Sequence, residues 1–111
     1  MPAKTRPYRE ALMEALADPV EAKHYLNAVL EDYPAGFLKA LRNVAQARQM
    51  AKVAQDSGIQ RESLYRALSD GGNPTLETLS AVLAAVGLKI SIATVGEGDP
   101  ISPNHAWKSH A

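Results

Sequence analysis

The residues of this sequence best suited to chemistry lie between Lys52 and Leu68, in the stretch KVAQDSGIQRESLYRAL. A short segment is followed by Gly58 and then by a second segment with two arginines, a glutamate and a tyrosine. Such side chains form several hydrogen bonds at once, and an arginine fits the edge of a guanine or a phosphate group. The pattern has two interpretations: a helical hairpin whose polar side faces water, or a helix presented to a DNA groove.

The spacing around Gly58 predicts two helices that cross closely. Ala54, four residues before the glycine, is small, and Gly58 permits a left-handed turn. Leu64, six residues after the glycine, is placed to fill the crossing, and Leu68 should also point inward. An exposed helix start that carries arginine can reach base edges in DNA. The outward residues of the second helix are Arg61, Glu62, Tyr65 and Arg66.

The charge of the chain is zero overall but unevenly distributed. Residues 39–75 carry six Lys and Arg against three Asp and Glu, an excess of +3. Residues 1–38 carry four against six, a balance of −2, and residues 76–111 carry two against three, a balance of −1. Because local potential rather than total charge steers a phosphate backbone, the excess gives modest support to the DNA interpretation.

The sequence contains little that favours catalysis, metal binding, export or membrane insertion. The three histidines, His24, His105 and His110, do not cluster with a carboxylate pair at a catalytic spacing. The sequence has no cysteine, which excludes disulfides and thiolate metal sites and is compatible with a reducing cytoplasm. It also lacks a signal-peptide pattern and an apolar run of about 18 residues. We therefore expect a cytoplasmic protein that is not an enzyme, with no cofactor, no metal and no membrane partner.

The elements that position the candidate residues should be mostly helical, because the apolar content of this single-domain chain is mainly Ala, Leu and Val. Three N-terminal helices are expected within residues 4–48. The second spans about 19–31 with Asp18 as its N-cap, and the third starts at Pro34. The predicted buried residues of the three helices are Tyr8, Leu12, Ala15 and Leu16; Tyr25, Ala28 and Val29; and Phe37, Leu38, Leu41, Val44 and Ala45.

The hairpin should comprise helices at about 50–56 and 61–69, within a motif spanning 50–69. Thr75 then caps a supporting helix, 75–86, that Gly87 ends in a left-handed conformation. The buried stripe predicted for this helix is Leu76, Leu79, Leu83 and Val86. We thus expect an all-α fold of five to six helices.

One strand is predicted after these helices, because LKISIATV at residues 88–95 alternates around β-branched residues. A lone strand cannot complete its hydrogen bonds, so we expect it to pair with its own copy in a homodimer. The residues expected at this dimer contact are Ile90, Ile92 and Thr94. Residues 1–95 would then form one domain, and the Gly- and Pro-rich residues 96–111 a flexible tail.

The stretch MAKVAQDSGIQRESLYRALSDGGNPTLETLSAVLAAVGL resembles the helix-turn-helix of phage repressors. The longer frame is more specific, since it adds RPYREALMEAL, DPVEAKHYLNAVLED, FLKALRNVAQAR and the final LKISI. Together these segments, over about residues 4–95, resemble the probable addiction-module antidote proteins, which are HigA-like antitoxins. The resemblance implies a small dimeric autorepressor that binds a RelE-like RNase toxin and the operator DNA of its own operon.

When the roles of the family's residues are carried over by position, the resemblance implies that the base-reading candidates are Arg61, Glu62, Tyr65 and Arg66. Glu62 can accept a hydrogen bond from cytosine N4, so it suits specificity. The candidates for contact with the DNA backbone are Gln49, Lys52, Gln60, Ser63 and Asn73. Gln60 and Ser63 could instead cap the helix, but Gln60 departs from the usual Ser or Thr, and glutamine caps poorly.

The toxin-binding surface is not identified by the resemblance. We favour the N-terminal helices over the tail with Trp107, because the acidic N-terminal segment suits a basic RNase. Two other functions stay open. The chain could be a stand-alone prophage transcription regulator on the same fold, or a protein-interaction bundle whose helix-turn-helix no longer binds DNA.

Overall fold

The computed structural model describes residues 5–96. Within these residues, six α-helices and one 3₁₀ turn follow one another: α1 (Thr5–Leu16), α2 (Pro19–Asp32), η2 (Pro34–Gly36), α3 (Phe37–Ala47), α4 (Met50–Ser57), α5 (Arg61–Ala67) and α6 (Leu76–Ala85). The expected all-α fold is therefore confirmed over these residues. Most of the predicted tail, residues 97–111, lies outside the described residues, as do residues 1–4.

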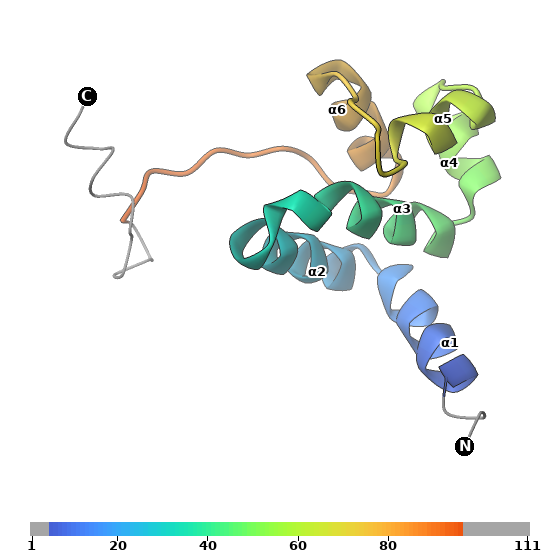
Figure 1. Cartoon of the computed structure of the whole chain (residues 1–111), viewed down its shortest axis with the longest axis horizontal. Coiled ribbons are helices and arrows are strands. Elements are labelled where there is room, and N and C mark those ends of the chain that lie inside the picture. Colours follow the sequence, from blue (N-terminus) through green and yellow to red (C-terminus); the bar gives the residue numbers. More distant parts are fainter. Residues whose placement is uncertain (1–4, 97–111) are drawn as a thin grey trace.

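α3 lies at the centre of the arrangement (Figure 1). It packs against α1 and α2 on one side and meets α4 on the other, and α4 in turn packs against α5 and α6. The core is correspondingly centred on α3, where Leu41 and Val44 are fully buried. Two polar contacts hold the N-terminal helices on α3. Arg9 Nη2 donates to Gln46 Oε1 (3.0 Å), and Arg48 Nη1, directly after α3, donates to the Ala17 carbonyl (3.3 Å).

The helix ends follow the capping residues that the sequence predicts. Asp18 accepts a hydrogen bond from the Val20 N–H (3.0 Å), with a proline at the first position of α2. Thr75 Oγ1 accepts from the Thr78 N–H (3.0 Å) at the start of α6, and Gly87 follows its end with a φ of +86°. Caps of these two kinds satisfy backbone groups that the helix leaves unpaired. The predicted caps are confirmed.

Some predictions of detail are wrong. The third helix begins at Phe37 rather than Pro34, because residues 34–36 form the tighter turn η2. Four residues predicted to be buried are exposed: Tyr8, Ala15, Ala28 and Leu76. In α2 the buried face runs through Ala22 and Leu26. Ala28 comes two residues after Leu26 and is therefore rotated by about 200° around the helix axis, to the opposite side. Near α6 the buried side chains come later than Leu76, at Val82 and Leu83 within the helix and at Val86 just after it.

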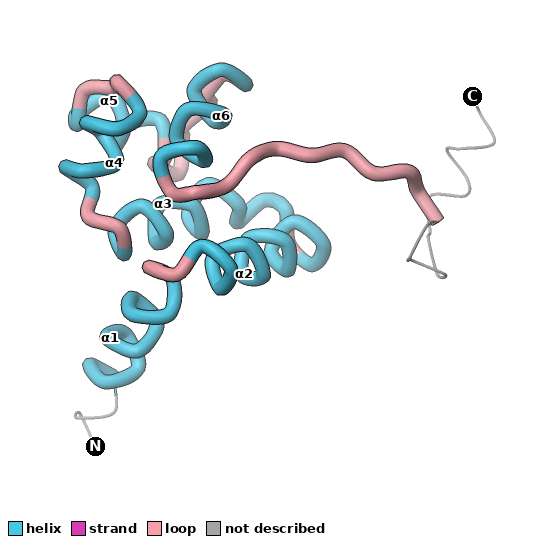
Figure 2. Tube along the Cα trace, turned by 180° about the vertical axis from the view of Figure 1, so that it is seen from behind, coloured by secondary structure: helices cyan, strands magenta, loops and turns pink. Residues whose placement is uncertain are grey.

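The segment after α6, residues 88–96, is here called the arm. It leaves the end of α6 and runs as an extended chain past the helices and away from them (Figures 1 and 2). Residues 88–95, predicted as a strand, form none within this single chain. A strand requires a neighbouring strand for its backbone hydrogen bonds, and a single copy offers none to the arm. The pairing of Ile90, Ile92 and Thr94 across a dimer therefore stays a prediction.

Candidate DNA-binding surface

The turn between α4 and α5 depends on Gly58. Its backbone lies in the left-handed region at φ +76°, which glycine adopts without the steric cost that a side chain brings. The N–H groups of Gly58 and Ile59 both donate to the Ala54 carbonyl, at 3.0 and 3.2 Å. These bonds end α4, and α5 begins after the three connecting residues 58–60. The left-handed turn expected at this glycine is confirmed.

The inner side of α5 is anchored by two leucines. Leu64 in α5 and Leu68 just after it are both fully buried. On α4, the facing side chains of Val53 and Ala54 are also buried, and the two helices pack against each other. Because Leu64 and Leu68 are one helical turn apart, they fix the rotation of α5 about its axis. The predicted packing of Ala54 and Leu64 is confirmed.

The four base-reading candidates lie on the solvent side of α5. Arg61, Glu62 and Arg66 are exposed, and the side chain of Tyr65 keeps 39% of its surface accessible. The Arg61 guanidinium lies over the Tyr65 ring, with Cζ 5.9 Å from the ring centroid. A cation and an aromatic ring at this distance attract each other. This contact was not predicted from the sequence, although the spacing of four residues in a helix could have indicated it.

A comparison with known protein families gives this surface its context. The profile of the family described as probable addiction module antidote protein matches residues 9–94 of the chain. The chain belongs to this family. One relative, described as an uncharacterized protein from Haemophilus influenzae, is 44% identical over 80 residues, which are 71% of this chain and 82% of the relative. No solved structure matches the chain. Family membership indicates the role of an antitoxin and, in general, a toxin as partner.

Two of the backbone-contact candidates of this antidote protein flank the start of α4. Lys52 is exposed and pairs with Asp56 one turn later, with 3.6 Å between Nζ and Oδ2. An exposed pair of this kind contributes little to stability, so Lys52 can exchange it for a phosphate. Gln49 precedes α4 with a positive φ of 71°, in a region that costs a non-glycine residue about 1–3 kcal/mol. Nothing in the sequence indicated this strained backbone.

The other three backbone-contact candidates differ in their surroundings. Gln60 is exposed and precedes α5, but its side chain makes no capping hydrogen bond, so the alternative that it caps α5 is wrong. Ser63 is half-buried. Asn73 is exposed in the loop between α5 and α6.

The loop that carries Asn73 is held against α5 by Gly72. A Cβ at this glycine would lie 2.2 Å from the Ala67 carbonyl oxygen, and the Gly72 N–H donates to the Ser69 carbonyl (2.9 Å). Gly71, by contrast, has open space around it. The composition predicts a loop here but gives no sign that one of the two glycines is required by close packing.

Among residues 5–96, no three His, Cys, Asp or Glu residues are grouped as they would be around a metal ion. None of the helices in the same part of the chain has both the length and the apolar character needed to cross a membrane.

Proposed function

We propose that this protein is the antitoxin of a toxin–antitoxin module, neutralises a RelE-like RNase toxin, and represses its own operon as a DNA-bound homodimer. The observation that carries the proposal is the orientation of α5 in a member of the antidote family. Its apolar side is buried through Leu64 and Leu68, and its polar side faces solvent with two arginines and a tyrosine. On this proposal, α4 and α5 form a helix-turn-helix motif.

In the proposed complex, α5 enters the major groove as the recognition helix. Arg61 is the first candidate for a bidentate contact with guanine O6 and N7, and Glu62 can accept from cytosine N4. The ring of Tyr65 supports the Arg61 guanidinium, which reduces the freedom that the side chain loses on binding. Lys52, Gln49 and Asn73 lie outside α5, where contacts with the DNA backbone would set its position.

A homodimer would match an operator that is an inverted repeat. Two recognition helices related by a two-fold axis read two half-sites about one helical turn apart in an inverted repeat. Each half-site alone binds weakly, so repression requires the two copies to be held together. The arm with Ile90, Ile92 and Thr94 is the segment that we assign to this contact.

The toxin should bind the α1–α2 pair, away from α5. Exposed carboxylates occur on both helices, among them Glu14 and Glu21. An RNase that binds a phosphate backbone carries a basic surface, to which these carboxylates are complementary. Reversal of charge at Glu10, Glu14 and Glu21 should weaken neutralisation, whereas deletion of residues 97–111 should leave it intact. Neutralisation that survives the reversals but is lost with the tail would assign the toxin to the tail.

The proposal is tested by expressing the protein with a reporter gene under the promoter of its own operon, and with the toxin gene next to it. We expect repression of the reporter and rescue of growth from the toxin. Repression without any neighbouring gene whose toxicity it relieves would favour a stand-alone transcription regulator. Rescue without repression would show a protein-binding antitoxin that does not bind DNA.

A further inference from the structure

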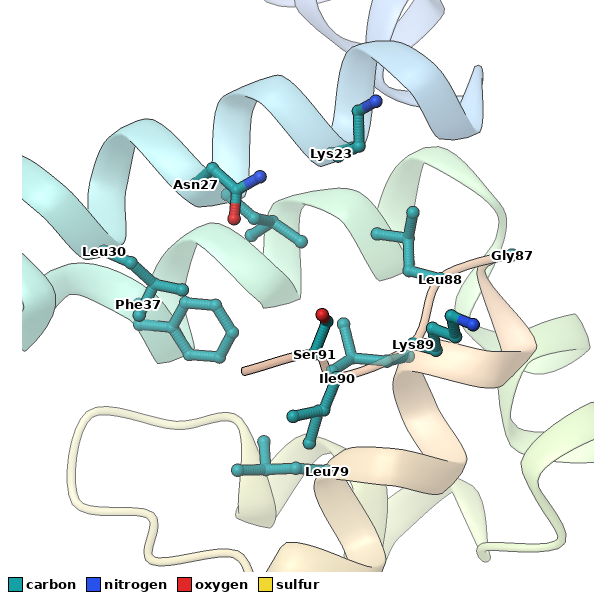
Figure 3. Close-up of a pocket in the computed structure, with 12 residues that line it drawn as sticks. Lys23, Asn27, Leu30, Phe37, Leu79, Gly87, Leu88, Lys89, Ile90 and Ser91 are labelled. Carbon is teal, nitrogen blue, oxygen red and sulfur yellow. The ribbon is translucent and has the colours of Figure 1, made fainter. Parts of the chain in front are cut away.

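An apolar groove of about 550 Å³ opens between α2, the start of α3, α6 and the base of the arm. Figure 3 shows Leu30 and Phe37 at one end of the groove, Leu79 at its floor, and Ile90 and Ser91 along its side. None of the lining residues belongs to α4 or α5, so an occupant of the groove leaves the candidate DNA-binding surface free.

The walls of the groove are not covered by the chain that forms them. Leu30 keeps 48% of its surface exposed, and Phe37 and Leu79 are only partly buried. Lys23, Asn27 and Lys89 also line the groove. An open apolar surface next to an exposed apolar segment is costly in water, and it commonly marks a binding site for another protein surface.

The arm supplies the exposed apolar segment. Its basal half, residues 88–91, forms one wall of the groove, whereas its distal half runs on beyond the helices (Figures 1 and 2). Ile92, the first residue past the groove, is 92% exposed, and Ile90 is 43% exposed. One chain therefore carries an open groove and a projecting apolar arm that does not fill it.

We propose that the groove of each chain is filled by the distal half of the arm of a second copy. The inference rests on the homodimer of the proposed function and adds the surface that receives the arm. Antiparallel pairing of two arms about an axis near Ile92 sets residues 93–96 of the second copy beside residues 88–91 of the first. Those residues form the wall of the groove, so the incoming segment lies over its apolar floor.

The exchange is self-complementary. Each chain contributes one arm and one groove, so a single two-fold axis satisfies both contacts and the assembly closes as a dimer. Pairing of the arms would add the strand-to-strand hydrogen bonds that an extended segment can form only with a neighbouring strand. The same contact removes Ile92 and the exposed part of Leu30 from water.

A matched pair of variants on α2 tests the groove. Leu30 lines it and is 48% exposed, whereas Val20 is 54% exposed on the same helix and does not line it. Leu30→Glu should raise the dimer dissociation constant at least about tenfold in sedimentation equilibrium, because it places a carboxylate against apolar side chains. Val20→Glu should leave the constant unchanged. Since both residues are exposed, neither change should affect the fold.

A second measurement uses the absence of cysteine from the sequence. With Leu30→Cys and Ala93→Cys in one chain, a short bis-maleimide should link the groove of one copy to the arm of the other. We expect a covalent dimer on denaturing gels and no link within one chain. A link confined to single chains would overturn the proposal, because the arm would then occupy its own groove.

The outcomes separate this inference from the proposed function. A dimer that Leu30→Glu does not weaken would overturn the inference and leave a dimeric repressor intact. A chain that is monomeric at all concentrations would overturn both. A groove that is open in the dimer but protected from labelling at Leu30→Cys by the toxin would assign the groove to the toxin and also overturn the inference.

Discussion

The α4–α5 hairpin and the arm are both exposed parts of the molecule, but they are exposed in opposite ways. α5 buries Leu64 completely and presents charged and polar residues to water. The arm presents Ile92, 92% exposed, and forms no strand with the rest of its chain. A polar surface is stable in a free protein, whereas exposed isoleucines favour association. The hairpin is therefore complete within one copy, and we propose that a second copy covers the arm.

The largest effect on the free energy of unfolding is expected at Leu64, which anchors α5 in the core. Leu64→Ala should lower the free energy of unfolding by about 2–5 kcal/mol, because it leaves a cavity between helices. Leu76→Ala is the control, since that leucine is 68% exposed and its loss should cost little. Urea denaturation followed by circular dichroism measures both. Equal, small effects would mean that α5 is not fixed by its leucine anchor.

The loop after α5 gives a second test of the hairpin. Gly72→Ala should destabilise the protein by about 2 kcal/mol, because the new Cβ meets the Ala67 carbonyl and the backbone has to move. Gly71→Ala has open space and should be nearly neutral. Thermal melts of the two variants provide the measurement. A neutral Gly72→Ala would show that the loop is not packed on α5 in solution.

A substitution in the arm should weaken the dimer without destabilising the single chain. Ile92→Asp should leave the melting temperature of dilute protein unchanged, since this side chain has few contacts in one copy. It should raise the dimer dissociation constant by at least about tenfold, which corresponds to about 1.4 kcal/mol. Sedimentation at several concentrations separates the two quantities. Loss of stability in the dilute monomer would mean that the arm packs on its own chain.

The smallest effect is expected at Lys52, on the edge of the hairpin surface. Lys52→Ala should weaken binding to all DNA sequences alike and reduce the salt slope by about 1, as loss of one phosphate contact does. The fold should not change, because the pair with Asp56 is exposed. Titrations at several salt concentrations give the slope. An unchanged slope would remove Lys52 from the DNA contact.

Features set by neighbours in the chain could be predicted from the sequence. The left-handed Gly58, the caps at Asp18 and Thr75, and the inward Leu64 each depend on one residue and its immediate spacing. Features that depend on distant packing could not. The requirement for Gly72 comes from its approach to Ala67, and the groove comes from helices far apart in the sequence.

The candidate DNA-binding surface also has features that local spacing predicts and features that it does not. That Arg61 and Arg66 face solvent follows from the period of a helix whose leucines are buried. The strain at Gln49 depends on how α3 meets α4, which no local pattern indicates. The proposed pairing of the arm would involve a second molecule, so neither the sequence pattern nor the fold of one chain determines it.

The role of α5 as a recognition helix is tested most directly by titrating a labelled duplex from the protein's own promoter and following fluorescence anisotropy. We predict that the protein prefers this duplex to a scrambled one. We also predict that Arg61→Ala loses about 1–3 kcal/mol of binding and relaxes the preference at one base pair. Lys39→Ala, which removes an exposed charge outside the hairpin, should leave the preference unchanged. A correctly folded Arg61→Ala variant that binds the promoter as the unmodified protein does would contradict the assignment of α5 as the recognition helix.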